Sequence, residues 1–314
     1  MTIPSPLFNI IGFDVYPYSL ALLAGAVLGL VLFAALARRL DAALVFGVFA
    51  IPLGIIGARV VFCLVRISFI AGEYGLSFVV NAPGGFSLMG AVLGVAAAAV
   101  ITARIVHKPR AYVMDIAAPS AMLTLAAARF GEAFTTDGIG RFTENPWFAR
   151  IPFAVPHADF TDEWHVAVFI WEGLAALAIA VVGAIIFRRN SSKQIRHGDA
   201  AATAATLFAA SQILLESLRE DSFLRFGFVR LNQLLCVALI ICAAVFWLRG
   251  AGARRVWVVA CGLAACVGAL VRIEFALDKS TMNNNILYGI MVAVLVVIAG
   301  LLFYGRGGDE AAAK

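Results

Sequence analysis

Two groups of charged and polar residues stand at the ends of long apolar runs, where ionised side chains are costly and usually functional. Arg129 and Glu132 are three residues apart at the end of one run. Gln212, Glu216 and Arg219 are spaced at i, i+4 and i+7 in another run, so they share one helix face. Guanidinium groups bind phosphate through paired hydrogen bonds, and a carboxylate can accept a proton. The polar stripe of the second group must face a cavity or the interior of the bundle rather than lipid, and Arg129 with Glu132 can simply form a salt bridge.

A further arginine lies inside another apolar run. Arg59, Cys63 and Arg66 follow helical spacing on one face. One interpretation is that Arg59 binds an anion. The other is that Arg59 pairs with a neighbouring helix while Arg66 extends to the membrane interface. The sequence leaves both interpretations open.

A glycine-rich segment with the sequence GGFSLMG occupies residues 84–90, just before an apolar run. Such a turn at a helix amino terminus exposes backbone N–H groups that could hold a phosphate or carbonyl oxygen. Close packing of glycines between membrane helices is the alternative. A second glycine-containing segment, with Asp137, Gly140 and Arg141, follows Glu132. We expect these polar segments to line one cavity that is open to lipid.

The elements that must hold these residues are membrane-spanning helices. The 314 residues are 62% apolar and only 14% charged, with a mean hydropathy of +0.95, which exceeds the usual values of soluble domains. The apolar runs are long and unbroken, whereas barrel strands would alternate over about ten residues. A net charge of +5 would suggest nucleic-acid binding in a soluble protein, but here the basic residues lie in short loops. We therefore expect no nucleic-acid partner.

Nine apolar runs are candidates to span a bilayer, since a span needs about 20 mostly apolar residues. The five cysteines lie within these runs and lack metal-ligand spacing, so neither disulfides nor a zinc site is expected. We expect no other metal and no cofactor. The predicted spans are 18–37, 43–65, 88–103, 115–131, 166–187, 200–218, 231–248, 256–272 and 286–304.

Basic residues occupy alternate loops between these spans. The positive-inside rule assigns such loops to the cytoplasm, so the amino terminus is expected outside and the carboxyl terminus inside. The first apolar run lacks a basic segment before it, which predicts a retained helix rather than a cleaved signal peptide. The basic loops are Arg38-Arg39, 104–110, 188–197 and 249–255.

The polar motifs also follow one another in a recognisable order. They are Tyr18, Gly57-Ala58-Arg59, Gly84-Gly85-x-Ser87-x-x-Gly90, Asp115-x-x-Ala118-Pro119, Arg129-x-Gly131, Gly140-Arg141, and Gly198 followed by Glu216 and Arg219. This order resembles the prolipoprotein diacylglyceryl transferases of bacterial inner membranes, over about residues 10–248.

The resemblance implies an all-α polytopic fold with a seven-helix diacylglyceryl-transferase-like bundle at 1–248, including an outer loop at 132–165. Two additional C-terminal transmembrane helices at 249–304 would lie outside the resemblance. A cytoplasmic tail would follow at 305–314, and its end copies a common helical linker unit, so it is left out of the functional reasoning.

In function, the resemblance implies a multi-pass enzyme of the bacterial cytoplasmic membrane. Such an enzyme moves a diacylglyceryl group from phosphatidylglycerol to the thiol of a lipobox cysteine in a prolipoprotein, forming a thioether and releasing glycerol phosphate. By this resemblance Arg129 would hold the phosphate, Glu216 would position its neighbours, and Tyr18 would orient lipid or substrate. The other residues expected to bind lipid or phosphate are Arg59, Gly84, Gly85, Ser87, Gly140, Arg141, Gln212 and Arg219.

The chain departs from the family's pattern at residues that matter for the chemistry. Met89 replaces a His and cannot accept a proton. Gln212 replaces an Arg, Glu132 replaces an Asn, and only Glu172 remains of a longer polar run before the fifth span. Three interpretations follow: a transferase in which Glu132 is the displaced base, a transferase with a changed lipid or acceptor, and a non-catalytic lipid-binding subunit of a membrane complex. A transporter is the alternative of another class, although no clear inverted repeat supports it.

Overall fold

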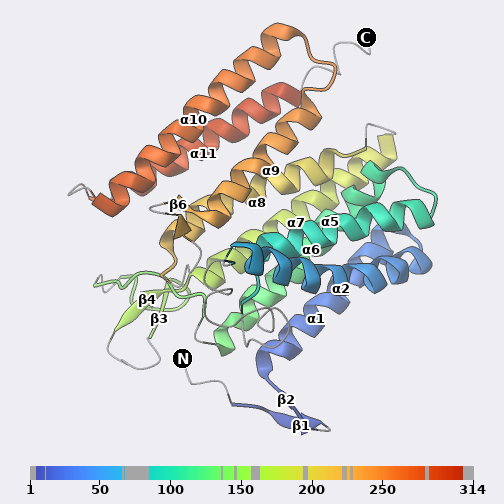
Figure 1. The fold of residues 1–314 in the computed structure, drawn as a ribbon, viewed down its shortest axis with the longest axis horizontal. Coiled ribbons are helices and arrows are strands. Elements are labelled where there is room, and N and C mark those ends of the chain that lie inside the picture. The colour runs from blue at the N-terminus through green and yellow to red at the C-terminus, as the bar shows by residue number, and fades with distance from the viewer. Residues whose placement is uncertain are drawn as a thin grey trace. The chain divides into compact units, whose positions relative to one another are not determined.

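The computed structural model is built of membrane-length helices, with short strands in several of the segments outside them (Figure 1). Among the residues it describes, eight helices are long and apolar enough to cross a membrane. They are α1 (Pro17–Ala37), α2 (Leu40–Val65), α5 (Leu88–Ile105), α6 (Arg110–Gly131), α7 (Val168–Lys193), α8 (Asp199–Leu218), α10 (Ala253–Lys279) and α11 (Asn284–Arg306). The structure describes residues 5–10, 12–65, 67, 85–135, 137–144, 147–156, 163–193, 197–220, 225–226, 229–279 and 283–306.

Each of the nine predicted spans coincides with a helix in this described part of the chain. The helix at the seventh position, α9 (Leu231–Trp247), has only 17 residues. At about 1.5 Å per residue it is at the short end of what can cross a hydrocarbon core of about 30 Å. The helices expose large apolar side chains, such as Leu23 and Val31 of α1, at 61% and 60%. Such surfaces suit lipid, and the chain is an all-helical polytopic membrane protein.

Three predicted boundaries are wrong by five residues or more: α6 begins at Arg110 and not at 115, α7 ends at Lys193 and not at 187, and α10 ends at Lys279 and not at 272. Helix α10 continues to Lys279, because its buried face keeps helical spacing beyond the predicted end at residue 272. Glu274 therefore lies inside the helix and is only 9% exposed. The buried residues at this end of α10 are Leu270, Ile273, Glu274 and Leu277.

Short antiparallel strand pairs lie in the segments outside the helices. The segment predicted as an outer loop at 132–165 begins with a 3-10 helix, η1 (Glu132–Phe134), and contains one of the pairs. The antiparallel pairs in the described residues are β1 (Phe8–Ile10) with β2 (Phe13–Val15), β3 (Ala154–Pro156) with β4 (Trp164–Val166), and β5 (Arg225–Phe226) with β6 (Val229–Arg230).

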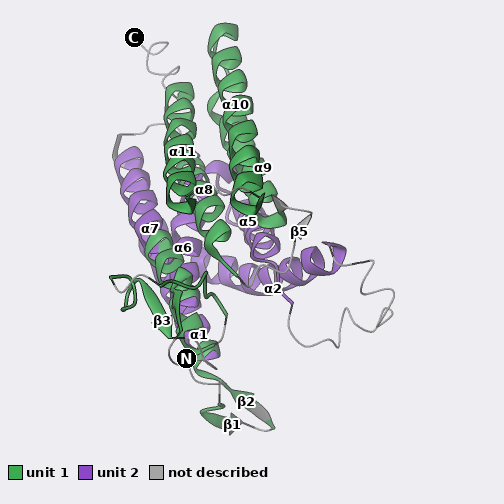
Figure 2. Cartoon of the chain, turned by 90° about the vertical axis from the view of Figure 1, so that its left-hand side faces the viewer, with its two compact units in different colours: residues 1–18, 129–176, 202–314 green, residues 19–128, 177–201 purple. Residues whose placement is uncertain are grey.

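The chain forms two compact units, which Figure 2 shows in different colours. Unit 1 comprises 1–18, 129–176 and 202–314, and unit 2 comprises 19–128 and 177–201. The cytoplasmic tail was predicted at 305–314. Its residues from position 307 onward lie outside the described part of the chain.

In unit 2, α2 and α5 pack closely because glycines face the partner backbone. A Cβ at Gly57 would overlap the carbonyl oxygen of Gly90, and a Cβ at Gly90 would overlap that of Gly57. Gly94 faces the carbonyl oxygen of Leu53 in the same way. Membrane helices use small residues for such approaches, because lipid supplies no hydrophobic drive between apolar helices. The close-packing interpretation is thus confirmed for Gly90.

We expect Gly94→Ala to lower the thermal unfolding midpoint, because its Cβ would push α5 away from Leu53 of α2. Overpacking of a tight interior costs about 1–3 kcal/mol. Unfolding in detergent, followed by fluorescence or circular dichroism, measures the effect. Gly300→Ala in α11 is the matched control, since a Cβ there meets no heavy atom within 4 Å. Equal midpoints for the two variants would contradict the close contact.

Candidate functional site

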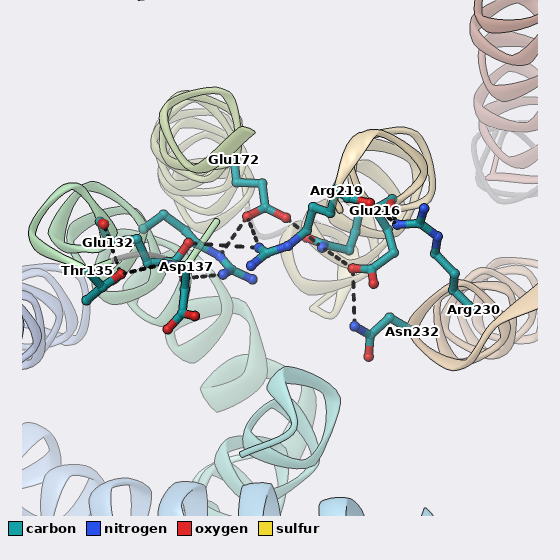
Figure 3. Close-up of polar contacts among 10 residues, drawn as sticks. Glu132, Thr135, Asp137, Glu172, Glu216, Arg219, Arg230 and Asn232 are labelled. Atoms are coloured by element: carbon teal, nitrogen blue, oxygen red, sulfur yellow. Dashed lines mark hydrogen bonds and ion pairs between the residues drawn. The ribbon is translucent and has the colours of Figure 1, made fainter. Parts of the chain in front are cut away.

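The centre of the site is an ion-pair network in unit 1 (Figure 3). Arg129, in the last turn of α6, forms an ion pair with Glu132 of η1. Its Nε lies 3.1 Å from Oε2 of Glu172, which belongs to α7. All three side chains are buried. The salt bridge predicted between Arg129 and Glu132 is confirmed, and Glu172 joins it from a helix about 40 residues further along the chain.

Arg219 completes the network directly after α8. Its Nη1 lies 2.8 Å from Oε2 of Glu172 and 3.9 Å from Oε2 of Glu132. Figure 3 shows Glu132, Glu172 and Arg219 directed toward one another. Together with Arg129 they place two guanidinium groups against two carboxylates, so the formal charges balance among the four side chains. Because such groups are costly to bury alone, loss of one member leaves a charge without its compensation.

The polar stripe of α8 points into this network, as its helical spacing predicted. Nε2 of Gln212 donates to Oε1 of Glu172 at 2.8 Å and to Oε2 of Glu216 at 3.3 Å. Nδ2 of Asn232 in α9 donates to the same oxygen of Glu216 at 3.2 Å. Gln212 and Glu216 are each 3% exposed, so the expectation that the stripe faces the protein interior is confirmed.

The segment after η1 brings backbone close to the network. Gly138 has φ +78°, and a Cβ there would overlap Oε2 of Glu132. The amide of Arg141 donates to the carbonyl oxygen of Leu218 at 3.2 Å, which ties the segment to the end of α8. A Cβ at Gly140 would lie only 2.7 Å from that carbonyl oxygen. The close backbone approach expected at Gly140 is therefore present, and the partner is the protein's own main chain.

Tyr18, the second residue of α1, belongs to the same unit as the network. It is half-buried, and the charges of Glu132 and Arg129 act on its hydroxyl group. This surrounding is compatible with a role in orienting a polar headgroup. The role itself stays a prediction.

Arg59 lies in unit 2, where it binds the turn before α5. Its Nη1 donates to the carbonyl oxygen of Gly85 at 3.0 Å. Its guanidinium also lies 5.9 Å from the ring centre of Phe62 and 5.7 Å from that of Phe86. These contacts favour the interpretation in which Arg59 pairs with a neighbouring segment, and anion binding by this residue stays a prediction.

The glycine-rich turn of unit 2 uses several of its amides internally. Oγ of Ser87 caps α5 by accepting from the amide of Gly90 at 3.3 Å, and the amide of Ser87 donates to Ala58 at 3.0 Å. Met89 is buried at 2% exposure and offers no polar atom that could serve as a base. Gly84 lies outside the described residues. Fewer backbone N–H donors of this turn are therefore available than expected. Phosphate binding by the turn stays a prediction.

Asp115, another residue of the predicted pattern, has a structural role in unit 2. Its Oδ2 accepts from the amide of Gly198 at 2.6 Å, and its Oδ1 accepts from the amide of Ala201 at 2.9 Å. These amides belong to the start of α8, whose first N–H groups have no partner within the helix. Asp115 thus acts as a helix cap supplied from α6, and the negative charge suits the positive end of the helix.

Sequence reasoning missed four polar residues in and around the network. Glu172 was noted only as the remnant of a longer motif, and Arg230, Asn232 and Glu274 were not identified as site residues at all. The rule that a buried charge in an apolar run marks a site applies to two of them. The rule did not identify Arg230, because the predicted span 231–248 begins one residue after it. It did not identify Glu274, because the predicted span 256–272 ends two residues before it.

The fold and the network define a class: a multi-pass helical membrane protein in which one buried and one partly buried guanidinium group are held by carboxylates. No group of three or more His, Cys, Asp or Glu side chains in the described part of the chain could hold a metal ion. The sequence model of the prolipoprotein diacylglyceryl transferase family matches residues 5–249. The chain belongs to this family.

Individual relatives agree over most of their length. A phosphatidylglycerol–prolipoprotein diacylglyceryl transferase of Gloeobacter violaceus is 32% identical over 268 residues, which cover 81% of this chain and 96% of that protein. Proteins of the same name from Frankia alni and Finegoldia magna are 29% and 25% identical over 256 and 250 residues. These matches cover 77% of this chain in both cases, and 67% and 94% of the two relatives. The resemblance inferred from the motifs is confirmed.

Proposed function

We propose that this protein transfers a diacylglyceryl group from phosphatidylglycerol to the cysteine thiol of a prolipoprotein, the activity for which its relatives are named. The observation that carries the proposal to this chain is the network of buried Arg129, Glu132 and Glu172 with the partly buried Arg219. A phosphodiester presents oxyanions that guanidinium groups bind in the same geometry as carboxylates. The headgroup phosphate can therefore take over donors that the two carboxylates now share.

The reaction breaks one carbon–oxygen bond and forms one carbon–sulfur bond. The sulfur attacks the glyceryl carbon that carries the phosphate, the electron pair of the broken bond stays on the phosphate oxygen, and glycerol phosphate leaves. The thiol proton must go to a base, because the thiolate is the nucleophile. The leaving phosphate gains negative charge, which Arg129 and Arg219 stabilise in a site removed from water.

Glu132 is the base in this proposal. Its Oε1 is held by Arg129, whereas its Oε2 accepts no hydrogen bond within the described residues. The distance of 3.9 Å from Oε2 to Nη1 of Arg219 is too long for a hydrogen bond. A carboxylate oxygen with an unused lone pair can take the thiol proton. After that transfer the four side chains carry one net positive charge, which complements the charge gained by the leaving phosphate.

The buried Met89 favours a second candidate function. Because the family's His is replaced there by an apolar residue with 2% exposure, the chain could bind an anionic lipid without transferring its acyl-bearing group. A related alternative is a transferase that acts on a different lipid or a different acceptor. Both retain Arg129 and Arg219 as the headgroup ligands, and both differ from the main proposal in lacking thioether formation with a lipobox peptide.

The orientation proposed for the chain in the bacterial cytoplasmic membrane has the amino terminus outside and the carboxyl terminus inside. The basic loops at the ends of the helices support it through the positive-inside rule. We assign residues 1–248 to a seven-helix transferase bundle and 249–304 to a pair of added helices, because the family match ends at residue 249.

We expect purified protein in detergent to move label from phosphatidylglycerol, labelled in an acyl chain, to a lipobox peptide. The same peptide with Cys→Ser is the matched acceptor control, since a hydroxyl is a far weaker nucleophile than a thiolate. Labelled cysteine peptide and unlabelled serine peptide would support transfer through a thioether. No labelled peptide, together with saturable binding of phosphatidylglycerol, would instead establish the lipid-binding candidate.

A further inference from the structure

Helices α10 and α11 lie beyond the part of the chain that matches the family, yet they belong to unit 1 with the ion-pair network. They pack side by side, next to α9 (Figure 1). Helix α10 carries one buried acid, Glu274, at 9% exposure. Glu274 accepts a hydrogen bond from Nε2 of Gln233, which is itself 5% exposed in α9. An added helix pair that served only as lipid-facing material would have no need for a buried carboxylate.

Gln233 connects Glu274 to Arg230 through hydrogen bonds. Its Oε1 accepts from the amide of Arg230 at 3.4 Å, and its Nε2 also donates to the carbonyl oxygen of Ile213 at 3.2 Å. One amide side chain thus joins α10, the start of α9 and the interior of α8. The orientation of the Gln233 side chain depends on Glu274, because among the described contacts the Glu274 carboxylate is the acceptor in α10 for the amide nitrogen.

Arg230 then holds the end of α8, where the network residues are. Its Nη1 donates to the carbonyl oxygens of Glu216 and, at 2.8 Å, of Arg219, and its Nη2 donates to that of Ser217 at 3.4 Å. The last carbonyl groups of a helix have no partner within it, so a cation at this place satisfies them and fixes the last turn. The direction of the Glu216 and Arg219 side chains is set by that turn.

Helix α11 contacts the same turn independently. The hydroxyl of Tyr288 donates to the carbonyl oxygen of Ser217 at 3.3 Å. Oγ of Ser217 lies 3.8 Å from the sulfur of Met291, which is fully buried. Helix α11 therefore contacts the end of α8 directly, whereas α10 is connected to it through Gln233 and Arg230.

We propose that α10 and α11 are an integral wall of the transfer site and that Glu274 is a positioning residue, acting through Gln233 and Arg230 on Glu216 and Arg219. Glu274 touches none of the reacting groups. The inference rests on the proposed function, since it assigns these helices to the same site. It gives the two helices that lie outside the resemblance a direct structural role in the arrangement of the headgroup ligands.

The test compares three variants of the full-length protein. Glu274→Ala removes the acceptor of Gln233 and should lower kcat about tenfold, as small displacements of catalytic groups do, with KM for phosphatidylglycerol unchanged. Glu274→Gln keeps an acceptor oxygen and should restore kcat to within about twofold of the wild type. Asp278→Asn is the matched control, because this exposed acid stands one turn further along the same helix.

Rates are expressed per folded protein, with the thermal midpoint of each variant measured in the same detergent. A purely structural Glu274 would lower the midpoint of Glu274→Ala and leave kcat per folded protein at the wild-type value, which would overturn the proposal. A Glu274→Gln variant as slow as Glu274→Ala would overturn it too, since the hydrogen bond would then not be the link.

A double-mutant cycle tests the route. If Glu274 acts through Gln233, the double variant Gln233→Ala/Glu274→Ala should be no slower than Gln233→Ala alone, whereas independent effects would multiply. Multiplied effects would overturn the proposed route.

A different measurement distinguishes failure of the proposed transferase function from failure of the inference about Glu274. If the wild type forms no labelled peptide, the same three variants are compared by the rise in thermal midpoint that phosphatidylglycerol vesicles or mixed micelles cause, because a ligand stabilises the state that binds it. A rise that is lost in Glu274→Ala and kept in Glu274→Gln and Asp278→Asn supports the coupling of the added helices to the headgroup ligands. An equal rise in all variants overturns it.

Discussion

Arg129→Ala is expected to abolish measurable transfer, with a loss of about a thousandfold or more in kcat. Arg129 supplies the buried one of the two guanidinium groups, and removal of a single preorganised donor to a developing oxyanion already costs about 10²–10³ in rate. The substitution also leaves Glu132 and Glu172 with fewer compensating charges in a buried place. Transfer of label from phosphatidylglycerol to a lipobox peptide measures the effect.

Two companion variants separate chemistry from folding. Arg129→Lys keeps the charge but loses the paired geometry of the guanidinium, so it should fold and retain a small part of the rate. Arg272→Ala removes an exposed arginine of α10 and should transfer as the wild type does. Arg129→Ala protein that folds, binds the lipid and transfers at the wild-type rate would remove the phosphate role from this residue.

Glu132→Gln is expected to reduce kcat by about 10²–10⁴, the usual contribution of a general base. The amide oxygen can still accept from Arg129, and the side chain keeps its volume, so the protein should fold. What it loses is the oxygen that takes the thiol proton. Both kcat and KM for phosphatidylglycerol should be measured, because the loss is expected in the chemical step rather than in lipid binding.

Glu144→Gln provides the matched control for that variant. Glu144 is an exposed acid in the segment after η1, and its neutralisation should leave transfer unchanged. A thiol that is supplied already ionised, through a rise in the pH of the assay, should partly restore transfer by Glu132→Gln. Unchanged transfer by Glu132→Gln at neutral pH would exclude Glu132 as the base.

Most of the helical architecture was predictable because apolar length is a local property. All nine predicted spans coincide with helices in the described residues, and their ends differ by only a few residues in most cases. The polar stripe of Gln212, Glu216 and Arg219 was predictable for the same reason. Helical spacing puts the three on one face, and lipid excludes that face, so the stripe had to point inward.

The partners of these residues were not predictable from spacing. Glu172 was a single acid near the start of a predicted span, and only the tertiary arrangement within unit 1 brings it within ion-pair distance of Arg129 and Arg219. Asp115 looked like part of a polar motif, yet the tertiary structure makes it the cap of α8. Contacts between residues 40 to 86 positions apart depend on how helices are arranged, which no local pattern states.

Sequence by itself determined the class of protein, the positions of the membrane helices and the inward face of α8, since each follows from hydropathy or from the 3.6-residue period of a helix. The tertiary structure alone decided that Glu172 joins the two arginines and that Arg230 holds the end of α8. It also decided that Glu274 of an added helix reaches the same turn through Gln233. The physical reason is that a buried charge must find its partner in space, and that partner is chosen by the packing of helices distant in the chain.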